Sequence, residues 1–141
     1  MKININSIVH FFSREPRKLF LVDGWGAALT TFSLFFVLRP YHDYIGLPTN
    51  ILIWLSVIGL VYGAFSISCY FLRKDNWAPY LRIIGIGNFL YCILTMTLLI
   101  FYHNTVTPLG WIYFLAEIFV IVLLVYIEWR TASRLSVRKT D

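Results

Sequence analysis

Three acidic residues, Asp23, Glu117 and Glu128, lie in stretches that are otherwise apolar. Glu117 is the most informative because it lies near the middle of 110–130, a stretch long and apolar enough to cross a membrane. A carboxyl group in hydrocarbon costs roughly 2.5 kcal/mol or more, so we expect Glu117 to face the protein interior. Such an acid can bind a proton or a cation, or it can join helices as a protonated hydrogen-bond donor. The sequence leaves both interpretations open.

Asn88 and Thr30 are the polar residues that we expect to orient Glu117. At about 1.5 Å per residue from the predicted cytoplasmic helix ends, four residues from four spans lie roughly 12–18 Å deep: Thr30, Gly63, Asn88 and Glu117. We therefore predict one polar layer near the membrane midplane. In this layer Glu117 is the candidate site for a proton or a ligand, and Asn88 and Thr30 support it.

A second polar layer is predicted closer to the cytoplasm, where Asp23, Arg82 and Glu128 fall at similar depths. One arginine there could neutralise part of the charge of two carboxylates. We predict a salt-bridge cluster that fixes the helix ends or gates access to Glu117 from the cytoplasm.

The histidines do not form a recognisable metal site. His42, Asp43 and His103 fall near the outer ends of two spans, on separate loops and without metal-ligand spacing. No two histidines face each other within the spans, which argues against b-type haem. The chain also lacks the G-x-S-x-G, P-loop and H-E-x-x-H motifs. We therefore expect no metal, no cofactor and no enzyme of the soluble type.

Four apolar stretches must position these residues. Of the 141 residues, 59% are hydrophobic and 13% are charged, whereas about a quarter of a typical soluble domain is charged. The predicted spans are approximately 19–38, 51–72, 80–102 and 111–129. Each is long enough for a hydrocarbon core of about 30 Å. The sequence therefore predicts an all-α integral membrane protein, an up-down-up-down four-helix bundle that occupies 19–130.

The flanking segments determine the predicted orientation. Segment 1–18 is expected to be cytoplasmic or interfacial, with 3–12 either a short surface helix or a frayed apolar tail, and 131–141 is a basic tail. Eleven of the twelve Lys and Arg residues fall on one side, with Arg39 on the other. The positive-inside rule then places both termini in the cytoplasm. Contact with lipid headgroups explains the net charge of +5, so no nucleic acid partner is predicted.

Small and polar residues recur at intervals of three and four along the spans, as in helices that pack closely in membranes. In the second span they are Ser56, Gly59, Gly63, Ser66 and Tyr70. Gly59 and Gly63 also form a GxxxG motif. We expect this motif to serve packing between helices of one chain. The alternative, which we favour less, is that it joins two copies of the chain.

Four segments carry a resemblance to known proteins: LFLVDGWGAALT, SISCYFL, NWAPYLRIIGIGNFLYC and YFLAEIFVIVLLVYIEW. Together they resemble a group of small four-helix inner-membrane proteins of bacteria, over roughly residues 19–131. No activity is attached to that group, so it implies no site residues. The four-span size is also similar to that of small multidrug transporters and DoxX-like proteins. The former have a glutamate in their first span, where this chain has Asp23, much nearer the interface.

Two classes of function follow from these residues. The first is a small transporter-like or ligand-binding membrane protein, with Glu117 as the group that gains and loses a proton. A transporter of this size can be expected to self-associate. The alternative is a non-catalytic subunit or scaffold of a larger membrane complex, favoured by the small outer loops and the lack of a reaction motif. A membrane-embedded lipid or quinone enzyme is a third class, supported only by His42, Asp43 and His103.

Overall fold

The computed structural model describes residues 4–72 and 76–140, so the basic residues of the predicted connector at 73–75 lie outside the described part. Within it, every regular element is a helix: α1 (Ile5–Arg14), α2 (Pro16–Phe32), η1 (Ser33–Leu38), α3 (His42–Ile45), α4 (Thr49–Phe71), α5 (Ala78–Phe101) and α6 (Pro108–Thr140). Four helical stretches in these residues are long and apolar enough to cross a membrane: Pro16–Leu38, Thr49–Phe71, Ala78–Phe101 and Pro108–Thr140. The all-α prediction and the four predicted spans are confirmed, as expected of a multi-pass membrane protein.

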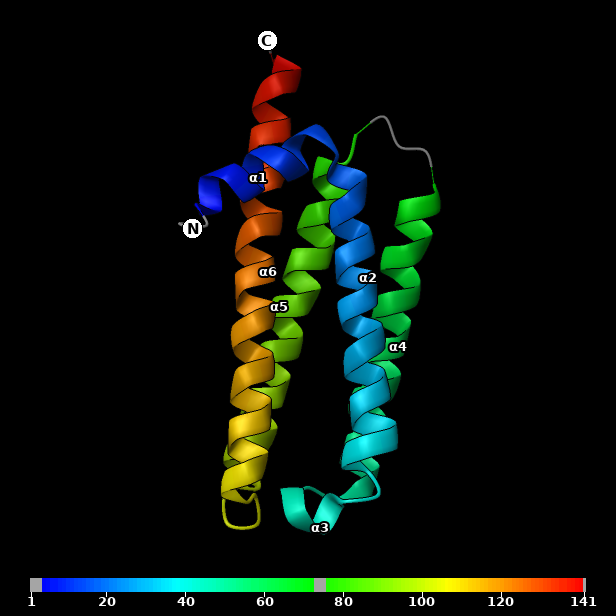
Figure 1. The fold of residues 1–141 in the computed structure, drawn as a ribbon, viewed down its shortest axis with the longest axis vertical. Coiled ribbons are helices and arrows are strands. Elements are labelled where there is room, and N and C mark those ends of the chain that lie inside the picture. Colours follow the sequence, from blue (N-terminus) through cyan, green and yellow to red (C-terminus); the bar gives the residue numbers. More distant parts are fainter. Residues whose placement is uncertain (1–3, 73–75, 141) are drawn as a thin grey trace.

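The long helices pack as two pairs, α2 along α4 and α5 along α6, with few contacts between the pairs (Figure 1). The N and C termini lie at one end of the bundle, where α1 crosses α6, and α3 lies at the other end. Many large side chains point outward into the surroundings, among them Trp25, Phe71 and Phe101. Lipid would cover such a surface, because exposed apolar side chains of this number suit hydrocarbon and not water.

Two apolar clusters hold the pairs together, one toward each end. The cluster near α3 includes Leu34, Leu52, Leu99 and Phe114, which are all fully buried. The cluster near the termini includes Leu19, Phe20, Leu81, Ile84 and Ala132. Asp23 and Asn88 fall between buried members of the two clusters along the first span and along α5.

At the terminal end, residues 5–14 form a helix and not a frayed tail, while the position of this helix on the membrane surface stays a prediction. Asn4 caps α1 by accepting a hydrogen bond from the Asn6 backbone N–H at 3.1 Å. Val9 is fully buried, and Arg130 of α6 donates to the Asn6 side chain at 3.2 Å. The helix is thereby held against the bundle.

The first span changes its winding over its last six residues. Residues Ser33–Leu38 form a π-helix, η1, in which the backbone N–H of Arg39 donates to the Leu34 carbonyl oxygen, five residues earlier, at 3.0 Å. π-helical turns are rare and occur frequently at functional sites. Here the π-helix begins at Ser33, which faces the cavity described below.

At the other end, the loop before α6 is bonded to the turn that follows α3. The backbone N–H of Thr107 donates to the Ile45 carbonyl oxygen at 3.0 Å, and its hydroxyl donates to the Tyr44 carbonyl oxygen at 2.5 Å. The same hydroxyl accepts from the Gly110 N–H at 3.1 Å, which caps the first turn of α6. Thr107 therefore links the two helix pairs and starts the last span.

Replacing Thr107 with valine should lower the free energy of unfolding by about 1–2 kcal/mol, because an N-cap and a bond between the pairs are lost together. Unfolding of the purified protein in mixed detergent micelles would measure this. Thr97→Val is the matched control, since the Thr97 hydroxyl is exposed and bonds only to the Ile93 carbonyl of its own helix. Equal losses in the two variants would contradict the assigned role of Thr107.

The GxxxG motif of α4 packs within the chain. A Cβ atom placed on Gly63 would lie 3.2 Å from the Ala27 Cβ, and one on Gly59 would lie 2.8 Å from the Thr31 hydroxyl, both on α2. The two glycines thus permit α2 and α4 to approach closely, which agrees with the interpretation favoured from the sequence.

Candidate functional site: a polar cavity between the helix pairs

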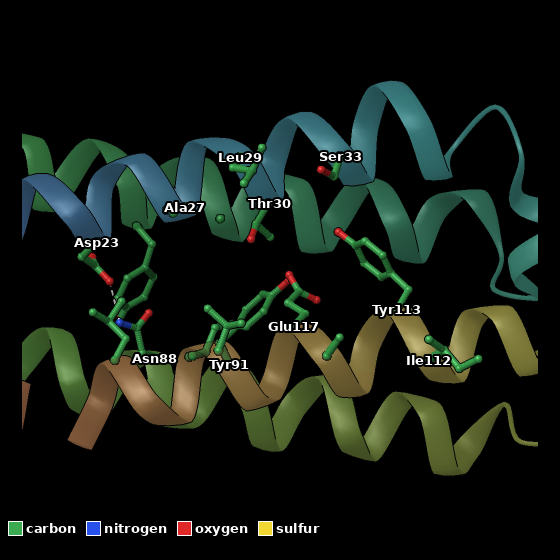
Figure 2. Close-up of a pocket in the computed structure, with 17 residues that line it drawn as sticks. Asp23, Ala27, Leu29, Thr30, Ser33, Asn88, Tyr91, Ile112, Tyr113 and Glu117 are labelled. Atoms are coloured by element: carbon green, nitrogen blue, oxygen red, sulfur yellow. Dashed lines mark hydrogen bonds between the residues drawn. The ribbon is translucent and has the colours of Figure 1, made fainter. Parts of the chain in front are cut away.

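A cavity of about 400 Å³ lies between the two helix pairs, inside the membrane-spanning part (Figure 2). α2, η1, α4, α5 and α6 all contribute side chains to it. Its wall is mostly apolar, with a small number of polar groups: Asp23, Thr30, Ser33, Tyr62, Asn88, Tyr91, Tyr113 and Glu117. Cavities of this size and composition are typical of small-molecule sites, where apolar walls give affinity and a few polar groups give orientation.

Glu117 lies in the middle of this cavity, with two hydroxyl groups near its carboxyl group. Both of its carboxyl oxygens are shielded, and neither makes a hydrogen bond of good geometry to the described residues. Thr30 and Tyr91 are close enough to interact with the carboxyl group. Figure 2 shows Thr30 reaching from α2 on the opposite side of the cavity. The predicted pairing of Thr30 with Glu117 in one layer therefore agrees with the geometry.

Tyr91 is a member of the Glu117 layer that the sequence reasoning missed. Its side chain is only 8% exposed, and its hydroxyl makes no hydrogen bond of good geometry to the described residues. A signal for it was present, because tyrosines of membrane proteins concentrate at the interfaces and Tyr91 falls deep within a span. Buried polar groups whose hydrogen bonds are poorly formed cost free energy, so a ligand or a water that bonds to Glu117 and Tyr91 would be stabilised here.

Asn88 belongs to a different layer from the one predicted for it. Its amide donates to Asp23 Oδ1 at 2.7 Å, and the Ser66 hydroxyl donates to Asp23 Oδ2. Asp23 is 3% exposed, so this cluster joins α2, α4 and α5 in the interior. Asn88 therefore supports Asp23 and does not orient Glu117. Tyr91, one turn further along α5, lies beside Glu117 instead (Figure 2).

Glu128 is fully buried, and neither of its carboxyl oxygens makes a hydrogen bond of good geometry to the described residues. A Cβ on Gly85 would lie 3.4 Å from Glu128 Oε2, so the carboxyl group packs directly against the backbone of α5. Asp23 is near enough to interact with it electrostatically. The prediction that Asp23 and Glu128 lie in the same layer agrees with this proximity.

The predicted salt bridge with Arg82 is not formed. In the described part of the chain, no ion pair joins Arg82 to either acid, and its guanidinium donates to the Ser136 hydroxyl at 3.3 Å. The reason is that α6 remains helical to Thr140, well beyond the predicted span end. This extension provides a partner for Arg82 on the exposed surface, where a guanidinium keeps its hydration.

Tyr62 crosses from one helix pair to the other. A Cβ on Gly87 would overlap the Tyr62 hydroxyl, so the phenol of α4 occupies space that only a glycine of α5 leaves. Tyr62, Tyr91 and Tyr113 all line the cavity, and Figure 2 shows the last two on the same side as Glu117. Gly87 and Tyr62 form one of the few contacts that join the pairs at the level of the site.

His42 and His103 do not come together with Asp43 to form a metal site. His42 Nδ1 lies 3.2 Å from Asp43 Oδ1, whereas His103 Nδ1 contacts the Ile100 carbonyl oxygen at 2.8 Å. No group of three His, Cys, Asp or Glu side chains that could hold a metal occurs in residues 4–72 and 76–140.

Comparison of the chain with protein-family models, with curated proteins and with solved structures found no match.

Proposed function

We propose that this chain is a small proton-linked membrane protein that holds a small ligand in the cavity between its helix pairs. Glu117 is the group that binds and releases the proton and contacts the ligand. Thr30 and Tyr91 complete its surroundings, and the Asp23–Asn88–Ser66 cluster closes the cavity toward the terminal end.

The observation that supports this proposal most is that the Glu117 carboxyl group, which makes no hydrogen bond of good geometry, faces a cavity of about 400 Å³. Glu128 also makes no such bond, but it packs against the α5 backbone and does not line the cavity, so the cavity is what distinguishes Glu117. Ionisable residues inside a membrane most often serve proton or ligand pathways. The aspartate, in contrast, has two partners on two helices, as a structural polar group should.

We further propose an up-down-up-down bundle with both termini in the cytoplasm, inserted in the inner membrane of a bacterium. Support comes from charge: Arg14, Arg17 and Lys18 lie at the same end as the basic C-terminal part of α6, while Arg39 lies near α3. Under this orientation the Asp23 cluster lies on the cytoplasmic side of Glu117.

Proton flux into liposomes tests the function. A pH difference across vesicles that contain the wild-type protein should drive an uptake of protons that Glu117→Gln reduces at least about tenfold, because the amide cannot take up or release a proton. A pH-sensitive dye inside the vesicles gives the rate. Asp43→Asn is the control, since the Asp43 side chain is 89% exposed outside the cavity and its loss should leave the flux unchanged.

Absence of flux in both proteins, with equal folding and insertion, would overturn the proton-linked function. The non-catalytic subunit would then be the better interpretation. Its signature would be co-purification of the wild-type chain with a larger membrane complex in stoichiometric amounts.

A further inference from the structure

We infer that the ligand of the cavity is an amphipathic primary or secondary amine that reaches the site from the hydrocarbon phase of the membrane. This inference rests on the proposed function and adds a chemical class of ligand and a direction of approach to it. Three features of the site carry it: the charge of the residues that line the cavity, the capacity of Glu117 to accept hydrogen bonds, and the position of the cavity opening.

The residues of the cavity wall that can carry a full charge near neutral pH are both acidic. Asp23 and Glu117 line it, and none of the described residues in its wall is Lys, Arg or His. A carboxylate or phosphate ligand would therefore place a negative charge beside two acids with no cation to compensate it, in a setting of low dielectric constant. An ammonium group would instead pair with Glu117. The cavity thus selects against anions and in favour of cations.

The hydrogen-bonding groups narrow the class further. The Glu117 carboxyl oxygens and the Tyr91 hydroxyl make no hydrogen bond of good geometry to the described residues, and Thr30 and Tyr91 are the two hydroxyl groups that interact with the carboxyl group, so an ionised Glu117 can accept further hydrogen bonds. A primary or secondary ammonium supplies N–H donors for these oxygens, whereas a quaternary ammonium supplies none. The three tyrosines of the wall, Tyr62, Tyr91 and Tyr113, add faces on which a cation is attracted.

The opening of the cavity lies between the two helix pairs and faces lipid. Three residues of its wall are exposed over most of their side chains: Leu29 of α2 at 67%, Ile112 of α6 at 67% and Val120 of α6 at 63%. These apolar side chains form the rim of the opening between α2 and α6. A ligand that passes them must be dissolved in the hydrocarbon, and its apolar body matches the mostly apolar wall.

Four probes with the same eight-carbon tail test the inference: octylamine, octyltrimethylammonium, octanol and octanoate. Calorimetric titration of the protein in nanodiscs, with empty nanodiscs of the same lipid subtracted, gives the affinity for each head group. Octylamine should bind saturably and at least about tenfold more tightly than the other three, because only its head group both carries positive charge and donates N–H bonds. This comparison uses the wild-type chain and so depends on no variant.

Glu117→Gln should weaken octylamine binding at least about tenfold and leave octanol binding unchanged. Glu15→Gln is the matched control, since Glu15 is exposed and pairs with Lys18 at the end of the bundle. It undergoes the same chemical change without touching the cavity, so octylamine affinity should stay at the wild-type value.

Octanoate or octanol binding as tightly as octylamine would overturn the ligand class, and so would octylamine binding that Glu117→Gln leaves unaltered. Equal affinity for octyltrimethylammonium would overturn the requirement for N–H donors. If proton flux depends on Glu117 but octylamine does not bind, the proposed function stands and this ligand class fails. If neither flux nor binding depends on Glu117, both fail.

Discussion

Replacing Gly46 with alanine should lower the free energy of unfolding by about 3 kcal/mol or more and the thermal unfolding midpoint by about 10 °C. Gly46 ends α3 at φ 86°, in the left-handed region that L side chains adopt at a cost of about 1–2 kcal/mol. A Cβ there would also lie 1.9 Å from the Thr105 carbonyl oxygen. Because that neighbour is backbone, the loop between α5 and α6 must move away. The bonds that Thr107 makes to this turn are then strained as well.

Thermal unfolding of the detergent-solubilised protein, followed by circular dichroism, measures this effect. Gly26→Ala is the control, because a Cβ on Gly26 meets nothing within 4 Å and alanine favours a helix interior by up to about 1 kcal/mol. The control should therefore unfold at the wild-type midpoint or slightly above it. A Gly46→Ala protein as stable as the control would show that the α3 turn does not hold the two pairs together.

Replacing Asp23 with alanine should lower the free energy of unfolding by about 1–3 kcal/mol. The change leaves the Ser66 hydroxyl and the Asn88 amide without their acceptor, and bonds between membrane helices are worth about 0.6 and at most about 1.7 kcal/mol each. Asp23→Asn should lose less, because its side-chain oxygen can still accept one of the two bonds. Unfolding in mixtures of mild detergent and dodecyl sulfate gives the three free energies.

Asp43→Ala serves as the control for Asp23→Ala, because the Asp43 side chain is 89% exposed and contacts only His42 at the described surface. It should change stability by less than about 0.5 kcal/mol. A double-mutant cycle of Asp23→Ala with Ser66→Ala isolates the bond between them. Strict additivity in that cycle would contradict the hydrogen bond from Ser66 to Asp23.

The sequence predicted the spans because their signal is local. Lengths near 20 apolar residues and breaks at charged or Pro-containing segments are properties of each stretch by itself, and the helices of the structure match them to within a few residues at most ends. Glu117 was predicted to face inward for an equally local reason, the cost of a carboxyl group in lipid, and its carboxyl oxygens are shielded. The end of α6 was the exception, since a polar helix beyond the membrane carries no hydropathy signal.

What only the tertiary structure decided is which polar group meets which. Counting residues from a span end gives depth to about one turn, whereas a hydrogen bond requires placement to within a fraction of an ångström. Helix ends, tilt and rotation all enter that placement, and each depends on packing against other helices. Asn88 was therefore assigned to Glu117 although it bonds to Asp23, and Arg82 to the acids although it bonds to Ser136. The cavity is likewise a property of the assembled pairs. Residues of both pairs line it, and it exists because the two pairs make few contacts with each other at this level.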